Sequence, residues 1–437
     1  MQFPSDFIAL LQNIRGIDAG ALLQALQKEP PVSVRINPAK PPTHLLFQEQ
    51  VPWCRFGYYL DTRPVFTLDP FFHAGTYYVQ EASSMFIEQW WKHIVPQNYP
   101  LRVLDMCAAP GGKSTHLLSL MPKSSVLICN EPINDRHPAL HHNIAKWGHS
   151  QVIITQNNPE DFETLEAYFD VILVDAPCSG EGMFRKDSDA VAHWSTENVR
   201  YCAKRQTRIL HSAVKALKPG GVLIYATCTF NETENEAHAE ALYNMGLQAQ
   251  NLTCVQDGIV SSTTGYRFYP HLIRGEGFYT ACFIKEGKWL PTELNDNNTS
   301  PSHPIMEQYL SEPHTFSHHT QLNRHYAMPF SVRSVFNSIK NVLRVRLAGI
   351  PLGEYKGNTF IPAAQLAFSI HLRSDVPGID VTSEEALKFL RGETFPIQSE
   401  IKGWHLVRYN GLALGWAKLI NGRFNNYYPK PWRIRMR

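Results

Sequence analysis

The sequence lacks any run of about 18 consecutive apolar residues, the length that a membrane-spanning helix requires. Its first residues, MQFPSDFIALLQ, have no basic segment ahead of the apolar ones and carry an acid at Asp6, which is a poor match to a secretory signal. We therefore expect a protein that is neither held in a membrane nor exported, and we predict that it acts in the cytoplasm.

Cysteine is scarce and scattered: the 437 residues contain eight, and no two of them form a CxxC pair. This argues against a zinc ribbon, a thioredoxin-type site and a dense disulfide framework. Each reduced thiol is then either a small buried hydrophobe or a chemical reagent. Five histidines fall between His303 and His325, but they share no ligand-like spacing with acids or cysteines, so we predict no metal site.

Net charge is also small, at +2, but it hides a gradient. From residue 320 onward there are 17 Lys and Arg residues against 7 Asp and Glu, whereas the preceding part has 24 against 32. Basic groups attract phosphates, and flat rings can stack on unpaired bases, so we predict a nucleic-acid-binding C-terminal part. The alternative is a solvated basic face with a frayed tail. The basic end combines the aromatic residues Phe424, Tyr427, Tyr428 and Trp432 with Lys418, Arg423, Lys430, Arg433, Arg435 and Arg437.

What is present is a regular alternation of strand and helix patterns from about residue 100. Apolar runs predict strands at residues 101–104, 126–129, 152–155, 169–174 and 222–226, with helices from about residue 114 and over 197–217. Such alternation predicts an α/β fold with a parallel sheet covered by helices on both faces. Ligands of these sheets lie beyond the carboxyl ends of the strands. The residues that follow the predicted strands are Asp105, Glu131, Asp175, Cys178 and Cys228.

The chain divides into four predicted regions. Residues 1–70 combine two short helices with a strand at 32–36 in a small α+β region, and residues 71–286 hold the alternating pattern. Residues 287–330, rich in Asn, Ser, Thr, Pro and His, predict a loose linker, and residues 331–437 form a smaller mixed region.

A turn of small residues follows the first strand of the alternating pattern. A P-loop for ATP would need a glycine where Cys107 stands, and the GxGxxG fingerprint of nicotinamide cofactors is absent. A nucleoside cofactor without a buried pyrophosphate remains, and S-adenosylmethionine fits. Glu131, 19 residues beyond Gly112, is placed to bind its ribose diol. The turn consists of Cys107, Ala108, Ala109, Pro110, Gly111, Gly112 and Lys113.

Two cysteines follow two further strands of the pattern. Cys178 closes the run Asp175-Ala176-Pro177-Cys178, and Cys228 follows Thr227. This pair suits methylation of a pyrimidine at C5, because a thiolate that adds to C6 makes C5 nucleophilic. A free thiol is only a few per cent ionised at pH 7, so the site must favour the thiolate. Asp175 could hold the proton that goes onto N3, and a second thiol could assist the final elimination.

Four segments together resemble the Sun/Nop family of RNA cytosine-C5 methyltransferases. They are residues 74–85, 105–113, 175–182 and 226–236, in family order. The tail, from Gly415-Trp416-Ala417-Lys418 through Tyr427-Tyr428-Pro429, is similar to the PUA-like end of the 16S ribosomal RNA methyltransferase F branch. The resemblance implies a Rossmann-like class I S-adenosylmethionine-dependent methyltransferase sheet, a small N-terminal RNA-binding region and a C-terminal PUA-like RNA-binding domain. It also implies that 5-methylcytidine is made in 16S ribosomal RNA.

The resemblance implies a role for each matching residue. Cys228 would be the nucleophile, Cys178 would assist product release, and Asp175 would serve both cofactor and target base. Residues 107–113 would bind S-adenosylmethionine. The remaining implied positions are Glu131 for the ribose, Arg136 as a basic position after that acid, and Lys186 near the target base.

The sequence departs from the family after the third strand, where an Asp usually contacts the adenosine. Asn158 aligns best with that Asp, and Asp161 lies a turn later. An amide can still donate a hydrogen bond to adenine, so the departure does not imply inactivity.

Three other functions stay open at this stage. The same chemistry could act on transfer RNA, the chain could be a non-catalytic RNA-binding ribosome assembly factor, or it could be a stand-alone ATPase. Either naked 16S RNA or the 30S subunit could be the substrate. Nothing in the sequence indicates obligate dimerisation, and we expect a monomer.

Overall fold

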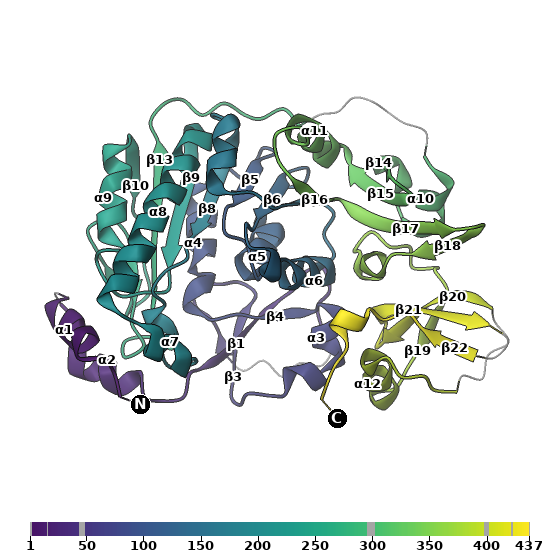
Figure 1. The fold of residues 1–437 in the computed structure, drawn as a ribbon, viewed down its shortest axis with the longest axis horizontal. Coiled ribbons are helices and arrows are strands. Elements are labelled where there is room, and N and C mark those ends of the chain that lie inside the picture. The colour runs from purple at the N-terminus through teal and green to yellow at the C-terminus, as the bar shows by residue number, and fades with distance from the viewer. Residues whose placement is uncertain are drawn as a thin grey trace.

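The computed structural model describes residues 2–14, 16–42, 49–294, 302–396, 402–420 and 423–436, which contain four β-sheets (Figure 1). The largest sheet occupies the left and centre of Figure 1, and the C-terminal elements form a second mass at the right. Across the described residues, no helix combines the length and the apolar character that crossing a membrane would demand.

The largest sheet has ten strands, and its centre is parallel. Along the sheet the order is β11-β12-β13-β9-β8-β5-β6-β7-β16, with β10 paired to β13. The five central strands are β9 (Leu217–Thr227), β8 (Phe169–Asp175), β5 (Arg102–Asp105), β6 (Val126–Asn130) and β7 (Val152–Thr155). They run parallel to one another. The predicted α/β fold with a parallel sheet is thus confirmed for these strands.

Strand β9 begins at Leu217, earlier than the predicted strand at 222–226. The Gly220-Gly221 pair lies inside it as an irregularity in its pairing with β8. Gly220 has a φ of +72°, and a Cβ there would lie 2.3 Å from the backbone nitrogen of Trp289. Only glycine therefore fits this position.

The two flanks of the sheet are antiparallel, which corrects the expectation of a wholly parallel sheet. One flank holds β13 (Phe278–Lys285), β12 (Tyr266–Phe268), β11 (Val260–Ser261) and β10 (Leu247–Gln250). On the other flank, β16 (Val345–Ala348) pairs with β7. A strand from beyond residue 330 thus completes the sheet, so the region predicted at 331–437 contributes its strand β16 to the largest sheet.

Helices cover both faces of the sheet, as predicted. One face packs against α4 (Ile87–Ile94), α5 (Gly112–Leu120) and α6 (His137–Trp147). The other packs against α8 (Thr196–Ala216), α9 (Glu236–Asn244) and α11 (Phe330–Ile339). Strand residues alternate between the two cores: Val103, Leu127 and Val171 face the first, and Leu104, Ile128 and Ile172 face the second. Period-2 alternation in strands buried on both faces explains their continuous apolar runs.

The N-terminal region is a small α+β unit that is hydrogen-bonded to the start of α5. Its helices are α1 (Ser5–Asn13), α2 (Ala19–Ala25) and α3 (Pro70–Ala74), and its antiparallel sheet has the order β2-β3-β1-β4. The strands are β1 (Val32–Ile36), β2 (Glu49–Gln50), β3 (Gly57–Leu60) and β4 (Tyr77–Val79). The buried guanidinium of Arg35 donates to the Gly112 carbonyl (3.1 Å) and to Thr115 Oγ1 (2.6 Å).

The segment predicted as a loose linker contains regular structure within its described part. It holds α10 (Pro304–Tyr309), β14 (Phe316–Gln321) and β15 (Arg324–Pro329), while residues 295–301 lie outside the described residues. The hairpin extends into a sheet with β17 (Ile350–Lys356) and β18 (Thr359–Pro362). The linker prediction is wrong for these elements, because Ile305, Met306 and Phe316 supply a buried core despite the polar composition.

The chain ends in a fourth sheet, of order β19-β20-β21-β22, with helix α12 (Ser383–Arg391). Its strands are β19 (Gly378–Asp380), β20 (Gly403–Tyr409), β21 (Leu412–Ile420) and β22 (Arg423–Asn426). Phe424 and Tyr428 are core residues here and cannot stack on a base. The ring of Trp432 stacks on His142 of α6 at 4.4 Å, which joins the C-terminus to the large sheet's helices.

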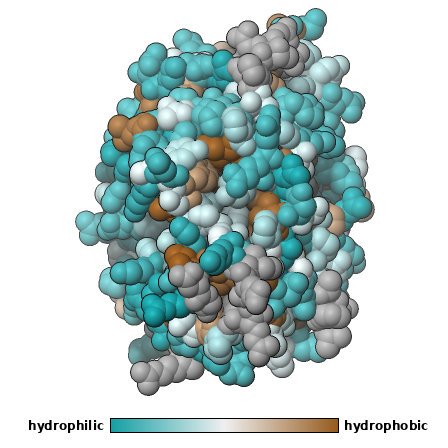
Figure 2. Space-filling view, turned by 90° about the vertical axis from the view of Figure 1, so that its right-hand side faces the viewer, coloured by the Kyte–Doolittle hydropathy of each residue, from teal (hydrophilic) through white to brown (hydrophobic). Residues whose placement is uncertain are grey.

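Tyr427 is the exposed member of the predicted aromatic set, with 42% of its surface accessible. Its ring lies against Trp404 at 4.4 Å, and the Lys418 ammonium lies 5.4 Å from the Trp404 ring centre. Arg437 lies outside the described residues. Figure 2 shows the right-hand face of the molecule, which is covered mainly by hydrophilic residues with separate small hydrophobic spots.

Candidate active site

The turn after β5 is shaped by one buried acid and two glycines. Ser114 Oγ donates to Asp105 Oδ2 at 2.7 Å, and burial raises the pKa of Asp105 to about 7. Gly111 has a φ of +108° and caps α5. A Cβ on Gly112 would lie 3.2 Å from the Tyr78 ring, so the small residue keeps the backbone close to its neighbours. The backbone N–H groups at the start of α5 remain at the edge of the turn.

A cavity of about 260 Å³ lies beyond the carboxyl ends of β5, β6 and β7. It brings together four of the residues that the sequence predicts for the cofactor: Cys107, Glu131, Arg136 and Asn158. Its wall also has an apolar part that was not predicted from the sequence and that includes Ile133, Pro159 and Ile209. No local pattern distinguishes these apolar residues from others in the core. A polar acid on one side and apolar walls on the other suit a nucleoside.

Glu131 is the buried acid of this cavity, with 1% of its surface exposed. Its Oε1 accepts from the Ile133 N–H at 2.9 Å. Its Oε2 lies 3.2 Å from Arg136 Nη1 but accepts no hydrogen bond from the described residues. A buried carboxylate oxygen with spare acceptor capacity fits a ribose hydroxyl, so the residues present fit the predicted nucleoside cofactor. Arg136 also donates to the Ala109 carbonyl at 2.6 Å and so links Glu131 to the turn.

Asn158 and Asp161 have different positions. Asn158 lines the cavity and is also the N-cap of the helical turn η4 (Pro159–Thr164), while the Asp161 carboxylate accepts from the Asn158 backbone N–H at 2.9 Å in the same capping box. Both residues are thus engaged in local structure, but of the two it is Asn158 that lines the cavity, which favours Asn158 as the adenosine contact. The role of Asn158 stays a prediction.

The two cysteines predicted to act together are neighbours. Strands β8 and β9 are adjacent and parallel, with Asp175 opposite Ala226, so Cys178 and Cys228 leave the sheet side by side. Their sulfur atoms lie 3.2 Å apart, and the Cys228 backbone N–H donates to Cys178 Sγ at 3.3 Å. The hydrogen bond with Cys228, and then burial, raises the pKa of Cys178 well above its ordinary value. Cys178 therefore stays a thiol near neutral pH. All eight cysteines are free.

Lys113 connects the cofactor turn with the cysteines. Its Nζ lies 2.8 Å from Asp175 Oδ2. Burial acts to lower the pKa of Lys113, but attraction to Asp175 and, more weakly, to Cys228 outweighs it and raises that pKa. A lysine that stays charged beside the cysteines favours an anionic sulfur.

Two buried carboxylates, which the sequence analysis did not single out, hold the cysteine loops together. Glu181 accepts from the backbone N–H of Phe230, and Glu234 accepts from that of Ser179. Asn231 Nδ2 donates to both carboxylates, at 2.9 and 2.8 Å. Fully satisfied buried networks of this kind fix geometry. Both acids lie inside the family-like segments, but their burial cannot be read from the sequence.

Lys186 follows the helical turn η5 (Glu181–Met183), and α7 (Ser188–His193) begins two residues later. Its ammonium lies 3.6 Å from Glu276 Oε1, and the same carboxylate accepts from Arg185 Nε at 2.9 Å. The structure thus gives Lys186 a partner in Glu276, and its predicted role near the target base stays a prediction.

Three features together define a class of enzyme: a parallel sheet, a cavity suited to a nucleoside beyond its strand ends, and two neighbouring free thiols. This class is the Rossmann-like class I S-adenosylmethionine-dependent methyltransferases, and the fold and cofactor predictions are confirmed by the comparisons that follow.

Three family models match the chain. They are 16S rRNA methyltransferase RsmB/F at residues 93–284, the N-terminal domain of 16S rRNA methyltransferase RsmF at residues 3–82, and the methyltransferase RsmF PUA domain at residues 377–434. Residues 93–284 therefore match the RsmB/F methyltransferase family, and the parts of the chain before and after them match two further domains of its RsmF branch, the last of which is a PUA domain.

Named relatives agree with this assignment. "Ribosomal RNA small subunit methyltransferase F" of Shewanella baltica strain OS195 is 29% identical over 412 residues, covering 87% of this chain and 84% of that protein. The same-named protein of Shewanella sp. strain MR-7 is 29% identical over 411 residues, covering 87% and 85%.

Two solved structures from Pyrococcus horikoshii are similar as well. A methyltransferase homolog is 28% identical, with a TM-score of 0.55, and covers 65% of this chain and 95% of its own. NSun6, solved with SFG, an S-adenosylmethionine analogue, is 20% identical, with a TM-score of 0.56, covering 65% and 99%. This last likeness shows the fold alone.

Proposed function

We propose that this enzyme methylates C5 of a cytidine in 16S ribosomal RNA through a covalent adduct between Cys228 and C6 of the base. The observation that carries the proposal is the 3.2 Å separation of the Cys178 and Cys228 sulfur atoms at the ends of neighbouring strands. Two thiols beside a methyl-donor cavity suit a reaction that must both form and break a carbon–sulfur bond.

The first step forms the bond between sulfur and carbon. Cys228 adds to C6 as thiolate, the C5–C6 π electron pair moves between C4 and C5, the C4–N3 π pair moves onto N3, and N3 takes up the proton that Asp175 holds. Lys113 favours the anionic sulfur, and Asp175, held by Lys113, is assigned to position the proton at N3. The bound cofactor supplies an electrophilic methyl group, which C5 takes with its electron pair.

The last step restores the aromatic base. The C5 proton leaves to water, its electron pair re-forms the C5–C6 double bond as the Cys228 sulfur departs from C6, and N3 returns its proton to Asp175. Cys178 stays a thiol, because its hydrogen bond with Cys228 and its burial raise its pKa. It can therefore donate a proton to the departing Cys228 sulfur, which makes that sulfur a better leaving group.

Cofactor binding is assigned to residues of this chain alone. The Glu131 carboxylate would accept from the ribose hydroxyls, Arg136 would hold Glu131 and the turn in place, and Asn158 would contact the adenosine. The turn of residues 107–113 would hold the amino-acid end of the cofactor. We keep the expectation that the protein acts as a monomer.

An RNA substrate follows from the family and from the PUA domain, whose exposed Tyr427 lies beside Trp404 and Lys418. The names of the relatives favour RNA of the small ribosomal subunit. With a ribosomal substrate, the protein would act in the cytoplasm.

The test is transfer of labelled methyl from S-adenosylmethionine with 30S subunits, naked 16S RNA and bulk transfer RNA offered in parallel. We expect label in 5-methylcytidine of one of the two ribosomal substrates. Label in transfer RNA alone would contradict the ribosomal substrate. Label in a base other than 5-methylcytidine would contradict the chemistry. A protein that binds the cofactor and RNA but labels nothing would favour the non-catalytic assembly factor.

A further inference from the structure

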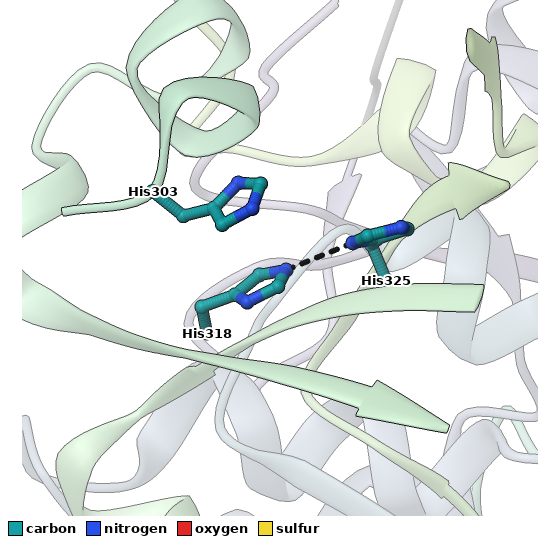
Figure 3. A group of neighbouring side chains, drawn as sticks. All are labelled: His303, His318 and His325. Carbon is teal, nitrogen blue, oxygen red and sulfur yellow. Dashed lines mark hydrogen bonds between the residues drawn. The ribbon is translucent and has the colours of Figure 1, made fainter. Parts of the chain in front are cut away.

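Three histidines that are distant in the sequence meet between α10 and the β14–β15 hairpin (Figure 3). His303 is the N-cap of α10, His318 lies on β14 and His325 on β15. In the hairpin, His318 pairs with Ala327 and His325 with Thr320, so the two histidines are diagonal neighbours on the same face. Figure 3 shows the His303 ring above this face, over that of His318.

The three imidazoles are closely packed. The rings of His303 and His318 are stacked with centres 3.8 Å apart, and His318 Nε2 lies 3.0 Å from His325 Nδ1. One nitrogen from each ring lies within 4.8 Å of the other two. In a tetrahedral zinc site with bonds of about 2.0–2.1 Å, ligand nitrogens are roughly 3.4 Å apart. Side-chain rotations that move the nitrogen atoms by on the order of 1 Å would bring all three to the spacing of a zinc site.

From this geometry we propose that His303, His318 and His325 bind a divalent first-row transition metal such as Zn²⁺, which clamps the start of α10 to the hairpin. Imidazole is a ligand that Zn²⁺, Cu²⁺ and Ni²⁺ prefer. No metal site was predicted here from the sequence, because spacing along the chain shows no ligand set. The fold brings together three histidines that their spacing along the chain does not relate.

The surroundings of the three histidines suit a metal. Tyr355 and Phe360 pack against the His325 ring, with centres 5.4 and 6.1 Å away, and provide an apolar outer wall. All three histidines are half-buried, and His325 also borders a cavity of about 350 Å³, which gives an ion an entry path. Coordination by His303 would replace one cap bond, in which its Nδ1 accepts from Ile305 at 3.2 Å.

A second cluster of ligand types, formed by Cys54, Glu88 and His116, is fully buried and internally hydrogen-bonded. Cys54 Sγ donates to Glu88 at 3.1 Å, and His116 Nε2 lies 3.0 Å from the same carboxylate oxygen. These contacts tie the three side chains to one another in the core, although His116 Nδ1 is buried without a hydrogen-bond partner among the described residues. This cluster and the thiols of Cys178 and Cys228 could also take up added metal. A metal titration must therefore distinguish them from the three histidines.

The test is a titration of full-length, metal-free protein with Co²⁺, followed by its visible absorption, with Zn²⁺ as the competitor. We expect one equivalent to bind without the near-ultraviolet charge-transfer band that thiolate ligation produces. His318→Gln and His325→Gln should each weaken binding by about 100-fold or more, since each removes a ligand. Zn²⁺ should raise the melting temperature of the wild type and not of these variants.

His314→Gln is the matched control, because His314 is exposed, lies in the same segment on the turn η6 (Pro313–Thr315), and is not part of the cluster. It should bind Co²⁺ as the wild type does. The melting temperatures of the metal-free variants show whether each is folded. The proposal is overturned if the wild type binds no Co²⁺, if both cluster variants bind it as tightly as the wild type, or if the bound Co²⁺ shows thiolate ligation.

Discussion

The sulfur atom of Cys178 accepts a hydrogen bond from the Cys228 backbone N–H and lies 3.2 Å from the Cys228 sulfur. The two thiols are therefore close but not equivalent. Cys178 is held as a thiol, and the charge of Lys113 lies near Cys228. This asymmetry favours Cys228 as the nucleophile and Cys178 as the proton donor during release.

Replacing Cys178 should stall the reaction at the covalent stage. In Cys178→Ala, Cys228 can still attack C6, but the departing sulfur has lost its proton donor. We expect an RNA-linked protein that survives a denaturing gel, whereas Cys228→Ala should show neither adduct nor methyl transfer. Cys202→Ala, which removes a buried thiol of α8, is the control and should behave as the wild type. An adduct in Cys228→Ala but not in Cys178→Ala would show that the two roles are exchanged.

Replacing Lys113 should change the pH dependence of the reaction. Lys113 is cationic, because attraction to Asp175 and Cys228 outweighs the effect of burial and raises its pKa. Removing this cation in Lys113→Met disfavours the anionic sulfur, so the rising limb of single-turnover rate against pH should move to higher pH. At pH 7 the rate should fall about 10-fold or more. Lys215→Met, whose partner is Glu163, should leave the profile unchanged. An unshifted limb in Lys113→Met would contradict this role.

Glu131→Gln should weaken the binding of S-adenosylhomocysteine, measured by calorimetry. A charge-assisted hydrogen bond contributes about 1.5–3 kcal/mol, which corresponds to roughly 10- to 150-fold in affinity. The control is Glu163→Gln, which contacts Ser212 and Lys215 instead. Unchanged affinity in Glu131→Gln would remove Glu131 from the ribose contact.

The roles of Asn158 and Asp161 can be distinguished by the same measurement of cofactor affinity. Asn158→Ala should weaken cofactor binding, because it removes a side chain that lines the cavity. Asp161→Asn alters the capping-box bond to the Asn158 backbone N–H but leaves the cavity wall intact, so it should affect the melting temperature more than the affinity. The opposite pattern would identify Asp161 as the adenosine contact.

The exposed ring of Tyr427 should contribute to RNA binding without affecting the cofactor. Stacking of one base on an aromatic ring is worth about 1–3 kcal/mol, so Tyr427→Ala should weaken 16S RNA binding by roughly 5- to 150-fold. Tyr243→Ala removes an exposed tyrosine of α9 and serves as the control. Binding must be compared at matched salt, because phosphate contacts depend on it. Equal RNA affinity in both variants would exclude Tyr427 from the RNA-binding surface.

The strands that carry the site could be predicted because each is a short apolar run that ends in a polar residue. Strand β7 was predicted at 152–155 and occupies Val152–Thr155, and Glu131 lies directly after β6. The addition of β16 to the same sheet could not be predicted, because it pairs with β7 from nearly 200 residues away. This also shows that a deletion from residue 331 would remove part of the methyltransferase sheet, so point variants test RNA binding more cleanly.

Burial was the other quantity that local patterns could not supply. Phe424 and Tyr428 lie in the same basic and aromatic stretch of sequence as the exposed Tyr427, yet they pack in the core. Glu181 and Glu234 are fully buried, although acids are usually exposed, because two loops supply donors to them.

The central claim is that Cys228 forms the bond to C6, and a substrate analogue tests it most directly. In 16S RNA that carries 5-fluorocytidine, the methylated base has fluorine where the departing C5 proton would be, so the adduct cannot resolve. Wild-type protein with S-adenosylmethionine should become linked to this RNA, and mass spectrometry of the digested complex should map the nucleotide to Cys228. A linkage at Cys178, or no linkage under conditions in which ordinary RNA is methylated, would contradict the account.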